Sequence, residues 1–289
     1  MTLLKQLIVF LTLAFTVTAA FSKNDTVVKE LGENVYMVSL LHYTSLVVVG
    51  EDDVLITDTA NPYRAKLLKA EIKKLTDKPV KKIVLSHEHF DHVGGTEIFP
   101  EAEIIAQANI REYEGLDPLN LVPDVIDQTF ERYMSIDMGT TKVELHHLFA
   151  ADGIATAIVY LPQEKVVLSA DMYVDEGLGG GVFLTDTNLL GVRKVLNIIL
   201  SWDVKYAINV HSSLASLAPL RRTASFLDDL YNVVLAKVKN VNDTDPSMLV
   251  PSILKLSTQL KMPKYQNWDN YNDLPIYVQK MGFSIVHGG

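Results

Sequence analysis

The N-terminal half of the chain alternates short runs of β-branched residues with turn residues. Val35–Val38, Leu46–Val49 and Val54–Thr57 are such runs, and the segments between them are rich in Gly, Asn, Asp and Glu. Runs of this composition between turn residues are typical of antiparallel strands joined by short connections. The pattern therefore predicts a meander of strands from Val27 to Thr59.

A helical pattern follows directly. From Asn61 to Thr76 apolar residues recur at intervals of three and four among lysines, as on one face of an amphipathic helix. A polar helical stretch is expected after residue 106 as far as Met138, and further helix from Asp245 to about Gly282. Strands are also predicted at 82–86, 103–106, 143–148, 155–161, 165–169 and 206–210, and helices at 187–202 and 217–239. Two groups of strands, each followed by helix, predict two sheets packed face to face with helices outside.

The first 22 residues have a different pattern. Lys5 precedes an uncharged run from Gln6 to Ser22, whose apolar centre, Leu7–Ala20, is shorter than the about 20 residues that a spanning helix needs. This layout is typical of a secretory signal peptide, with an uncleaved anchor as the alternative. We expect residues 1–22 to be a signal peptide and 23–289 one domain, including a helical extension over about 241–289. The protein is then periplasmic or secreted, without stable membrane association after cleavage.

The composition narrows the possible chemistry. The 289 residues are 48% hydrophobic and 21% charged, which indicates a globular protein with a sizeable core. The absence of cysteine excludes disulfides, thiolate metal sites and thiol nucleophiles. A net charge of −9 disfavours binding to nucleic acid. We therefore expect a small-molecule substrate and chemistry based on His, carboxylates or hydroxyls; the oligomeric state stays open.

The densest group of potential metal ligands follows the predicted strand at 82–86. The segment Ser86–Gly95 contains three histidines and two acids within six positions, a set of nitrogen and oxygen donors suited to zinc or iron. Residues two apart in an extended segment point the same way, so His87 and His89 can hold one ion. The following turn can bring Asp91 and His92 to a second ion. The segment therefore predicts a metal centre.

The order His87, His89, Asp91, His92 resembles the His-x-His-x-Asp-His hallmark of the metallo-β-lactamase-fold hydrolases. The resemblance extends over roughly 27–231, where Asp171 stands in the place of the family's metal-bridging Asp and His211 in the place of its last His ligand. It implies an α/β fold, a four-layer αββα sandwich (the metallo-β-lactamase fold) with extra C-terminal helices. It also implies two divalent metal ions, with zinc favoured and iron or manganese also compatible.

One expected ligand differs from the family pattern. The resemblance places a third histidine eight positions before a strand aromatic, here Tyr160, and that position is occupied by Asp152. The implied ligands are His87, His89 and Asp152 for the first ion and Asp91, His92 and His211 for the second, with Asp171 bridging. A carboxylate can ligate zinc, and it favours iron or manganese more than imidazole does. The alternatives are a degenerate single-metal enzyme, a non-catalytic relative acting as a binding protein, or an iron enzyme with redox chemistry.

The resemblance implies hydrolysis. Two ions sharing a water lower its pKa from about 15.7 to about 7, giving a bridging hydroxide that attacks an ester, thioester, lactone or amide carbonyl, β-lactams included. Asp91 would orient this nucleophile and pass a proton to the leaving group. Asp58 resembles the family's buried Asp, which orients ligand imidazoles. Because Asp171 stands where one group of true β-lactamases has Cys, the sequence fits glyoxalase-II-like, lactonase-like or arylsulfatase-like relatives better. The Glu176–Phe183 loop is interpreted as an apolar flap or a plain connection.

Overall fold

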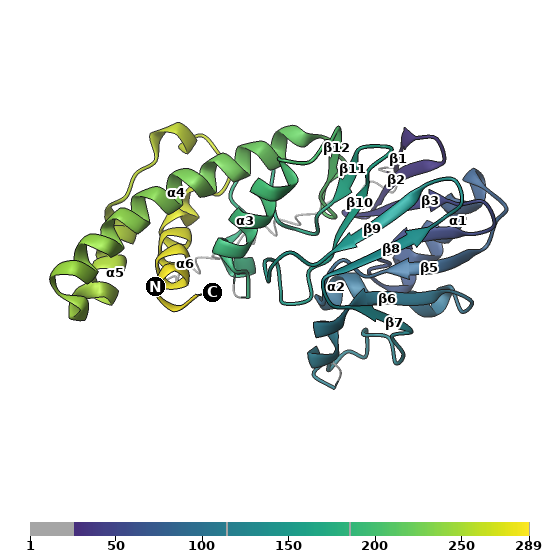
Figure 1. The fold of residues 1–289 in the computed structure, drawn as a ribbon, viewed down its shortest axis with the longest axis horizontal. Coiled ribbons are helices and arrows are strands. Elements are labelled where there is room, and N and C mark those ends of the chain that lie inside the picture. Colours follow the sequence, from purple (N-terminus) through teal and green to yellow (C-terminus); the bar gives the residue numbers. More distant parts are fainter. Residues whose placement is uncertain (1–25, 114, 185, 289) are drawn as a thin grey trace, which may run out of the picture.

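Two β-sheets face each other in the larger part of the molecule (Figure 1). The computed structural model describes residues 26–113, 115–184 and 186–288, so the predicted signal peptide lies outside the described residues. Strands β1 to β7 form one sheet in sequence order, and the second sheet has the order β12-β11-β10-β9-β8. The strands are β1 (Val27–Gly32), β2 (Val35–Leu40), β3 (Tyr43–Val49), β4 (Val54–Thr57), β5 (Val80–Val84), β6 (Glu103–Gln107), β7 (Gln128–Phe130), β8 (Tyr133–Asp137), β9 (Lys142–His146), β10 (Ile158–Leu161), β11 (Val166–Leu168) and β12 (Tyr206–Ile208).

Helices cover the outer faces of both sheets. The apolar side chains of α1 (Pro62–Leu75) pack on the seven-stranded sheet. Helices α3 (Leu189–Ile199) and α4 (Leu217–Thr244) pack on the five-stranded sheet. The layers are therefore helix, sheet, sheet and helix, which is the predicted αββα sandwich. The predicted meander is confirmed, because β1 to β4 pair antiparallel in succession.

The core between the sheets comes from alternate positions of the strands. Met37 of β2, Leu46 of β3 and Leu55 of β4 meet Val159 and Leu168 of the opposite sheet, and all five are fully buried. Truncating one such side chain to Ala costs about 2–5 kcal/mol in other cores. This rigid core fixes the strand ends, and the loops that carry the candidate ligands begin there.

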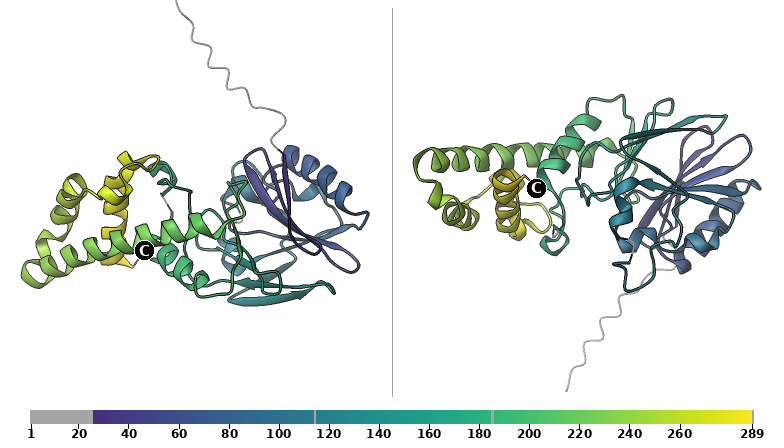
Figure 2. Two further views of the ribbon diagram at one scale, coloured as in Figure 1. Left: turned by 90° about the horizontal axis from the view of Figure 1, so that it is seen from above. Right: turned by 60° about the horizontal axis from the view of Figure 1, so that its bottom comes forward.

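The C-terminal helices extend from one side of the sandwich (Figures 1 and 2). Helices α5 (Leu249–Gln259) and α6 (Leu274–His287) pack against α4. Phe226 of α4 contacts the rings of Tyr265, Trp268 and Tyr277 at centroid distances of 5.1, 5.6 and 5.7 Å. The tail is therefore helical and packs on the domain through aromatic side chains. Within the described ranges, none of the helices combines the length and the apolar character needed to span a bilayer.

One predicted element is wrong. The stretch after residue 106 was expected to be helical as far as Met138, but it contains a 3₁₀ turn at Ala108–Tyr113 and then β7 and β8. Pro118 and Pro123 break the intervening segment, because proline lacks the amide hydrogen that a helix interior needs. Strand β8 pairs antiparallel with β9 over five residues. Pairing of β7 with β6 and of β8 with β9 thus makes these parts of the segment strands, although its polar composition predicts a helix.

Candidate metal centre

The seven predicted ligands lie after strand ends, on loops and on one short helix. His87 and His89 follow β5, Asp91 and His92 are in the short helix α2 (Phe90–Val93), and the other three come after β9, β11 and β12. Their donor atoms form overlapping groups within 4.8 Å: His87, His89, Asp152 and Asp171; Asp58, His87 and His92; Asp91, His92 and His211. The structure thus brings together every residue predicted for the centre. Their role as ligands stays a prediction.

Several ring nitrogens face each other across a shared space. His87 Nε2 lies 2.9 Å from His89 Nδ1, and His92 Nε2 lies 3.2 Å from His211 Nε2. Asp171 Oδ2 lies 3.2 Å from His92 Nε2 and 3.0 Å from His211 Nε2. Among the described residues, its buried Oδ1 has no hydrogen-bond partner. Converging lone pairs and an unpartnered buried carboxylate oxygen fit a divalent cation, because nitrogen and carboxylate oxygen are ligands that zinc accepts.

The charges of the cluster are unevenly distributed when no cation is bound. Burial, together with the charge of Asp171, raises the pKa of Asp152 to about 7. Burial and the nearby charge of His92 hold the pKa of His87 well below its ordinary value. Burial opposes ionisation of Asp171 too, but the charged His92 and the hydrogen bond from His211 place its pKa well below the ordinary value. Two carboxylates and a neutral imidazole in one buried space would each gain from a positive ion between them.

Asp58 lies under the cluster, as the sequence predicts. It is buried, and its carboxylate accepts hydrogen bonds from the backbone N–H and the hydroxyl of Ser86 at 2.8 and 2.6 Å. Its Oδ2 is 3.5 Å from His92 Nδ1. Asp58 has a φ of 35° and Ala170, next to Asp171, a φ of 49°. Non-glycine residues rarely adopt this left-handed backbone, and such strain concentrates at functional sites.

Glu88 fixes the loop that carries Asp152. Its buried carboxylate accepts hydrogen bonds from the backbone N–H groups of Ile154 and Ala155 at 2.6 and 3.0 Å. Gly153 has a φ of 82°, and a Cβ there would collide with the carboxyl group of Glu88. The position therefore requires glycine for both backbone conformation and space. Glu88, which the sequence suggested as one more donor, positions the loop and lies outside the three donor groups.

Asp186 is a site residue that the sequence did not reveal. Its Oδ2 lies 2.7 Å from His89 Nε2, the ring nitrogen that points away from the cluster. A carboxylate at this place holds the ring orientation and leaves Nδ1 free to bind a metal ion. Asp186 lies in a loop just before α3, almost one hundred positions from its partner, and no local pattern marks it.

Tyr43 is a second residue that sequence reasoning missed. Its ring lies 5.0 Å from the His211 ring and 5.6 Å from the His92 ring, measured between centroids. The hydroxyl donates to Asp91 Oδ2 at 3.4 Å. Burial and the charge of Asp91 raise the pKa of the Tyr43 hydroxyl, so it keeps its proton at neutral pH. Tyr43 thus places a hydrogen-bond donor at the edge of the cluster.

Arg64 anchors the hairpin that carries Tyr43. The side chain is fully buried, and burial lowers its pKa to about 10. It donates hydrogen bonds to Leu40 O, Tyr43 O, Ser45 Oγ and Asp58 O. The spacing with Leu68 and Ile72 on the buried side of α1 could have revealed it, because residues four apart share a helix face.

The side chains of His146 and His147 are not part of the cluster. His146 Nε2 lies 3.1 Å from Glu144 Oε2, and His147 Nδ1 lies 2.8 Å from the carbonyl oxygen of Thr156. Neither belongs to a donor group among the described residues. They therefore do not compensate for the missing third histidine.

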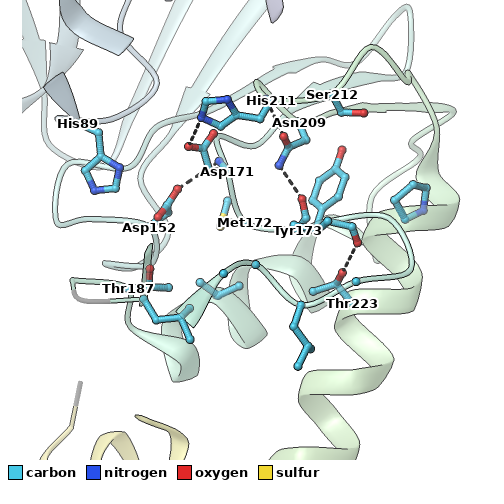
Figure 3. Close-up of a pocket in the computed structure, with 18 of the residues that line it drawn as sticks. His89, Asp152, Asp171, Met172, Tyr173, Thr187, Asn209, His211, Ser212 and Thr223 are labelled. Carbon is cyan, nitrogen blue, oxygen red and sulfur yellow. Dashed lines mark hydrogen bonds and ion pairs between the residues drawn. The ribbon is translucent and has the colours of Figure 1, made fainter. Parts of the chain in front are cut away.

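A cavity of about 1050 Å³ opens beside the cluster (Figure 3). Figure 3 shows His89, Asp152, Asp171 and His211 on one side, and Thr223 of α4 toward the other end. The Gly177–Gly180 segment, α3, α4 and Tyr277 of α6 supply other parts of the wall. The volume is at the upper end of the range for small-molecule sites. The predicted flap segment thus borders the cavity, together with one tail aromatic.

Comparison with known proteins identifies one family. Residues 39–179 match the sequence model of the metallo-beta-lactamase superfamily. A linear primary-alkylsulfatase from Pseudomonas sp. (strain ATCC 19151) is 33% identical over 63 residues, which are 22% of this chain and 12% of the relative. The chain therefore matches only a small part of that relative.

Solved structures share the fold. A metallo-beta-lactamase from Pontibacter korlensis superposes with a TM-score of 0.60 at 20% identity, covering 71% of this chain and 99% of the other. The stereoselective inverting sec-alkylsulfatase Pisa1 from Pseudomonas sp. gives a TM-score of 0.71 at 14% identity, covering 92% of this chain. The chain spans about half of that protein, 51%. The sequence match assigns residues 39–179 to the metallo-beta-lactamase superfamily, and the solved structures share the fold of the chain.

Proposed function

We propose that the protein is a metal-dependent hydrolase that cleaves an ester-type bond of a small molecule. The bonds considered are esters, thioesters, lactones and amides, including β-lactams. The observation that carries the proposal is the convergence of seven His and Asp side chains, five of which line a cavity of small-molecule size. The match of residues 39–179 to the superfamily supports a divalent metal centre at this place. We propose zinc as the metal, with iron or manganese as the alternatives.

The donor groups suggest how the chain would hold two ions. His87, His89 and Asp152 would bind one, Asp91, His92 and His211 the other, and Asp171 would lie between them. When bound, divalent ions supply Lewis acidity that activates a water and polarises the bond to be cleaved. In the hydrolysis the water oxygen bonds to the acyl carbon, the bond to the leaving group breaks, and the leaving group takes a proton.

Asp91 would move that proton. Burial raises its pKa, but the hydrogen bond and charge of His92 outweigh burial and place the pKa at about 2. Asp91 is therefore ionised at neutral pH and can accept a proton from water. Its carboxylate is half exposed toward the cavity, so it can then pass the proton to a leaving group.

Replacement of one ligand tests the proposal. His89→Ala should lower kcat/KM for activated esters by more than about 100-fold, the upper range for outer-sphere partners of metal ligands. His287→Ala, at an exposed position of α6 outside the cluster, is the matched control and should keep its activity. Unchanged turnover in His89→Ala would remove the cluster from the mechanism.

A sulfate ester is a second candidate bond. Two of the similar proteins are alkylsulfatases, and the alignment with one of them covers 92% of this chain. That coverage extends beyond the 71% shared with the lactamase, so the alkylsulfatase likeness reaches further along the chain. Release of inorganic sulfate from an alkyl sulfate would support this bond, and its absence beside ester cleavage would exclude it.

We further propose export by a signal peptide at residues 1–22, with a periplasmic or secreted mature protein that binds no nucleic acid and no membrane. Only the sequence pattern supports this proposal. N-terminal sequencing of the protein secreted by its own cells tests it. A mature chain that still begins at Met1 would contradict it.

A further inference from the structure

The cavity beside the candidate metal centre has an apolar wall away from the ligands. Its buried apolar side chains come from the segment after β11, from α3 and from α4. They include Met172, Leu178, Leu184, Leu189, Val192 and Leu227. Tyr277 of α6 adds its ring, and its hydroxyl donates to Gly179 O at 3.2 Å. An apolar wall of this kind favours a ligand that loses hydrocarbon surface to water on binding.

The charged groups of the cavity are all acidic apart from histidine. Its wall includes six carboxylates: Glu88, Asp91, Asp152, Asp171, Asp175 and Asp186. Among the described residues, no Lys or Arg lines it. Proteins hold carboxylate, phosphate and sulfate groups of ligands mainly with Arg and Lys, because these supply charge-assisted hydrogen bonds. The wall thus lacks the usual partners of an anionic substrate.

Arg222, the cationic residue that precedes the wall residue Thr223, is already paired. Arg222 of α4 forms an ion pair with Asp175, and its Nε is 3.8 Å from Glu176 Oε1. The carboxylate of Asp175, which itself lines the cavity, offsets the charge of the guanidinium. Arg222 therefore adds little positive charge to the cavity.

The predicted ligand set also carries much negative charge. Three of its seven side chains are carboxylates, those of Asp91, Asp152 and Asp171. These carboxylates would offset most of the charge that two divalent ions bring. An anionic head group would then lose its hydration without gaining a strong counter-charge.

We propose that the substrate is an uncharged ester or lactone with an apolar tail, which lies along Met172, Leu178 and Leu227 while the ester faces the ligand cluster. The inference rests on the proposed hydrolase function and narrows its substrate class. It separates this protein from the alkylsulfatases it resembles, whose sulfate esters are anionic.

Competitive binding tests the charge preference without relying on turnover. The metal-loaded full chain is incubated with the neutral dye Nile red. Octyl acetate and octyl sulfate are then compared as competitors, below the solubility limit of octyl acetate and the micelle concentration of octyl sulfate. Octyl acetate should displace the dye at a concentration at least about tenfold lower than octyl sulfate. Equal or tighter binding of octyl sulfate would overturn the inference.

Turnover of the same two compounds separates the two proposals. Release of acetate without release of sulfate supports both the hydrolase proposal and the inferred preference for uncharged esters. Release of sulfate at the greater rate overturns the inference and leaves the hydrolase proposal standing. If neither is cleaved while octyl acetate still binds more tightly, the hydrolase proposal fails and the charge preference stands.

A pair of variants locates the effect in this cavity. Leu214→Arg adds a cation at an exposed position of the cavity wall, three residues after His211. It should strengthen binding of octyl sulfate several-fold relative to binding of octyl acetate. Leu254→Arg adds the same cation at a similarly exposed position of α5. It should change the binding of neither octyl sulfate nor octyl acetate. Equal effects of the two variants would overturn the assignment of the charge preference to this cavity.

Discussion

Glu88 is expected to couple the stability of the fold to the metal centre. The substitution Glu88→Gln keeps the size of the side chain but replaces one carboxylate oxygen with an NH₂ group. One of the two hydrogen bonds from Ile154 and Ala155 is then lost, and a buried N–H faces another donor. A hydrogen bond to a charged group contributes about 1.5–3 kcal/mol, and an unsatisfied buried donor costs a similar amount. The free energy of unfolding should therefore fall by about 2–4 kcal/mol.

Urea denaturation followed by circular dichroism measures this change, and titration with a chromogenic chelator measures metal affinity. Affinity at the first site should fall by about 10- to 100-fold, because the loop that holds Asp152 loses its anchor. Glu144→Gln is the matched control, since Glu144 is half-buried beside His146 and away from the cluster. It should cost less than about 1 kcal/mol. A Glu88→Gln protein as stable as this control would refute the anchoring role.

Three further changes test other parts of the site. Arg64→Lys should lower the free energy of unfolding in urea by about 2 kcal/mol, because an ammonium group cannot replace the forked contacts of the guanidinium. The control Arg221→Lys, at an exposed position, should leave the free energy of unfolding unchanged. The pKa of Asp152 lies at about 7 in the metal-free protein, above its ordinary value, so this group contributes stability below about pH 4 that is lost as the pH rises toward 7. Asp152→Asn should thus stabilise the metal-free protein at about pH 8, by up to about 4 kcal/mol, and have little effect at about pH 4; the same effect at both pH values would contradict this. Asp186→Ala should weaken zinc binding about tenfold in a chelator competition. Asp186→Asn should lose less zinc affinity, because its side-chain oxygen still accepts a hydrogen bond from the His89 ring. Unchanged zinc affinity in both variants would contradict the positioning role of Asp186.

The strands and the ligand loops were predictable because local pattern and tertiary structure agree there. The runs at Val35–Val38, Leu46–Val49 and Val54–Thr57 are buried in the sheets, where β-branched residues pack well. The segment from His87 to His92 directly follows a buried strand, so its spacing alone indicated convergent donors. The order of these elements along the chain predicted the four layers of helix, sheet, sheet and helix.

Long-range contacts limited the rest of the prediction. Strands β7 and β8 form because they pair with β6 and β9, and nothing within their own short sequences requires it. Asp186 reaches His89 only after the chain has folded. The absence of Lys and Arg from the described cavity wall is likewise a property of the assembled surface. Arg64 differs, because its helical spacing with Leu68 is visible in the sequence.

The metal content of the protein tests the proposed centre most directly. The full mature chain is purified without chelator, reconstituted with zinc, and analysed for metal per chain by mass spectrometry. Binding of about two ions per chain is expected, with one ion lost in an Asp152→Ala variant because the first site loses a ligand. A wild-type protein that retains no divalent ion after reconstitution would contradict the metal centre.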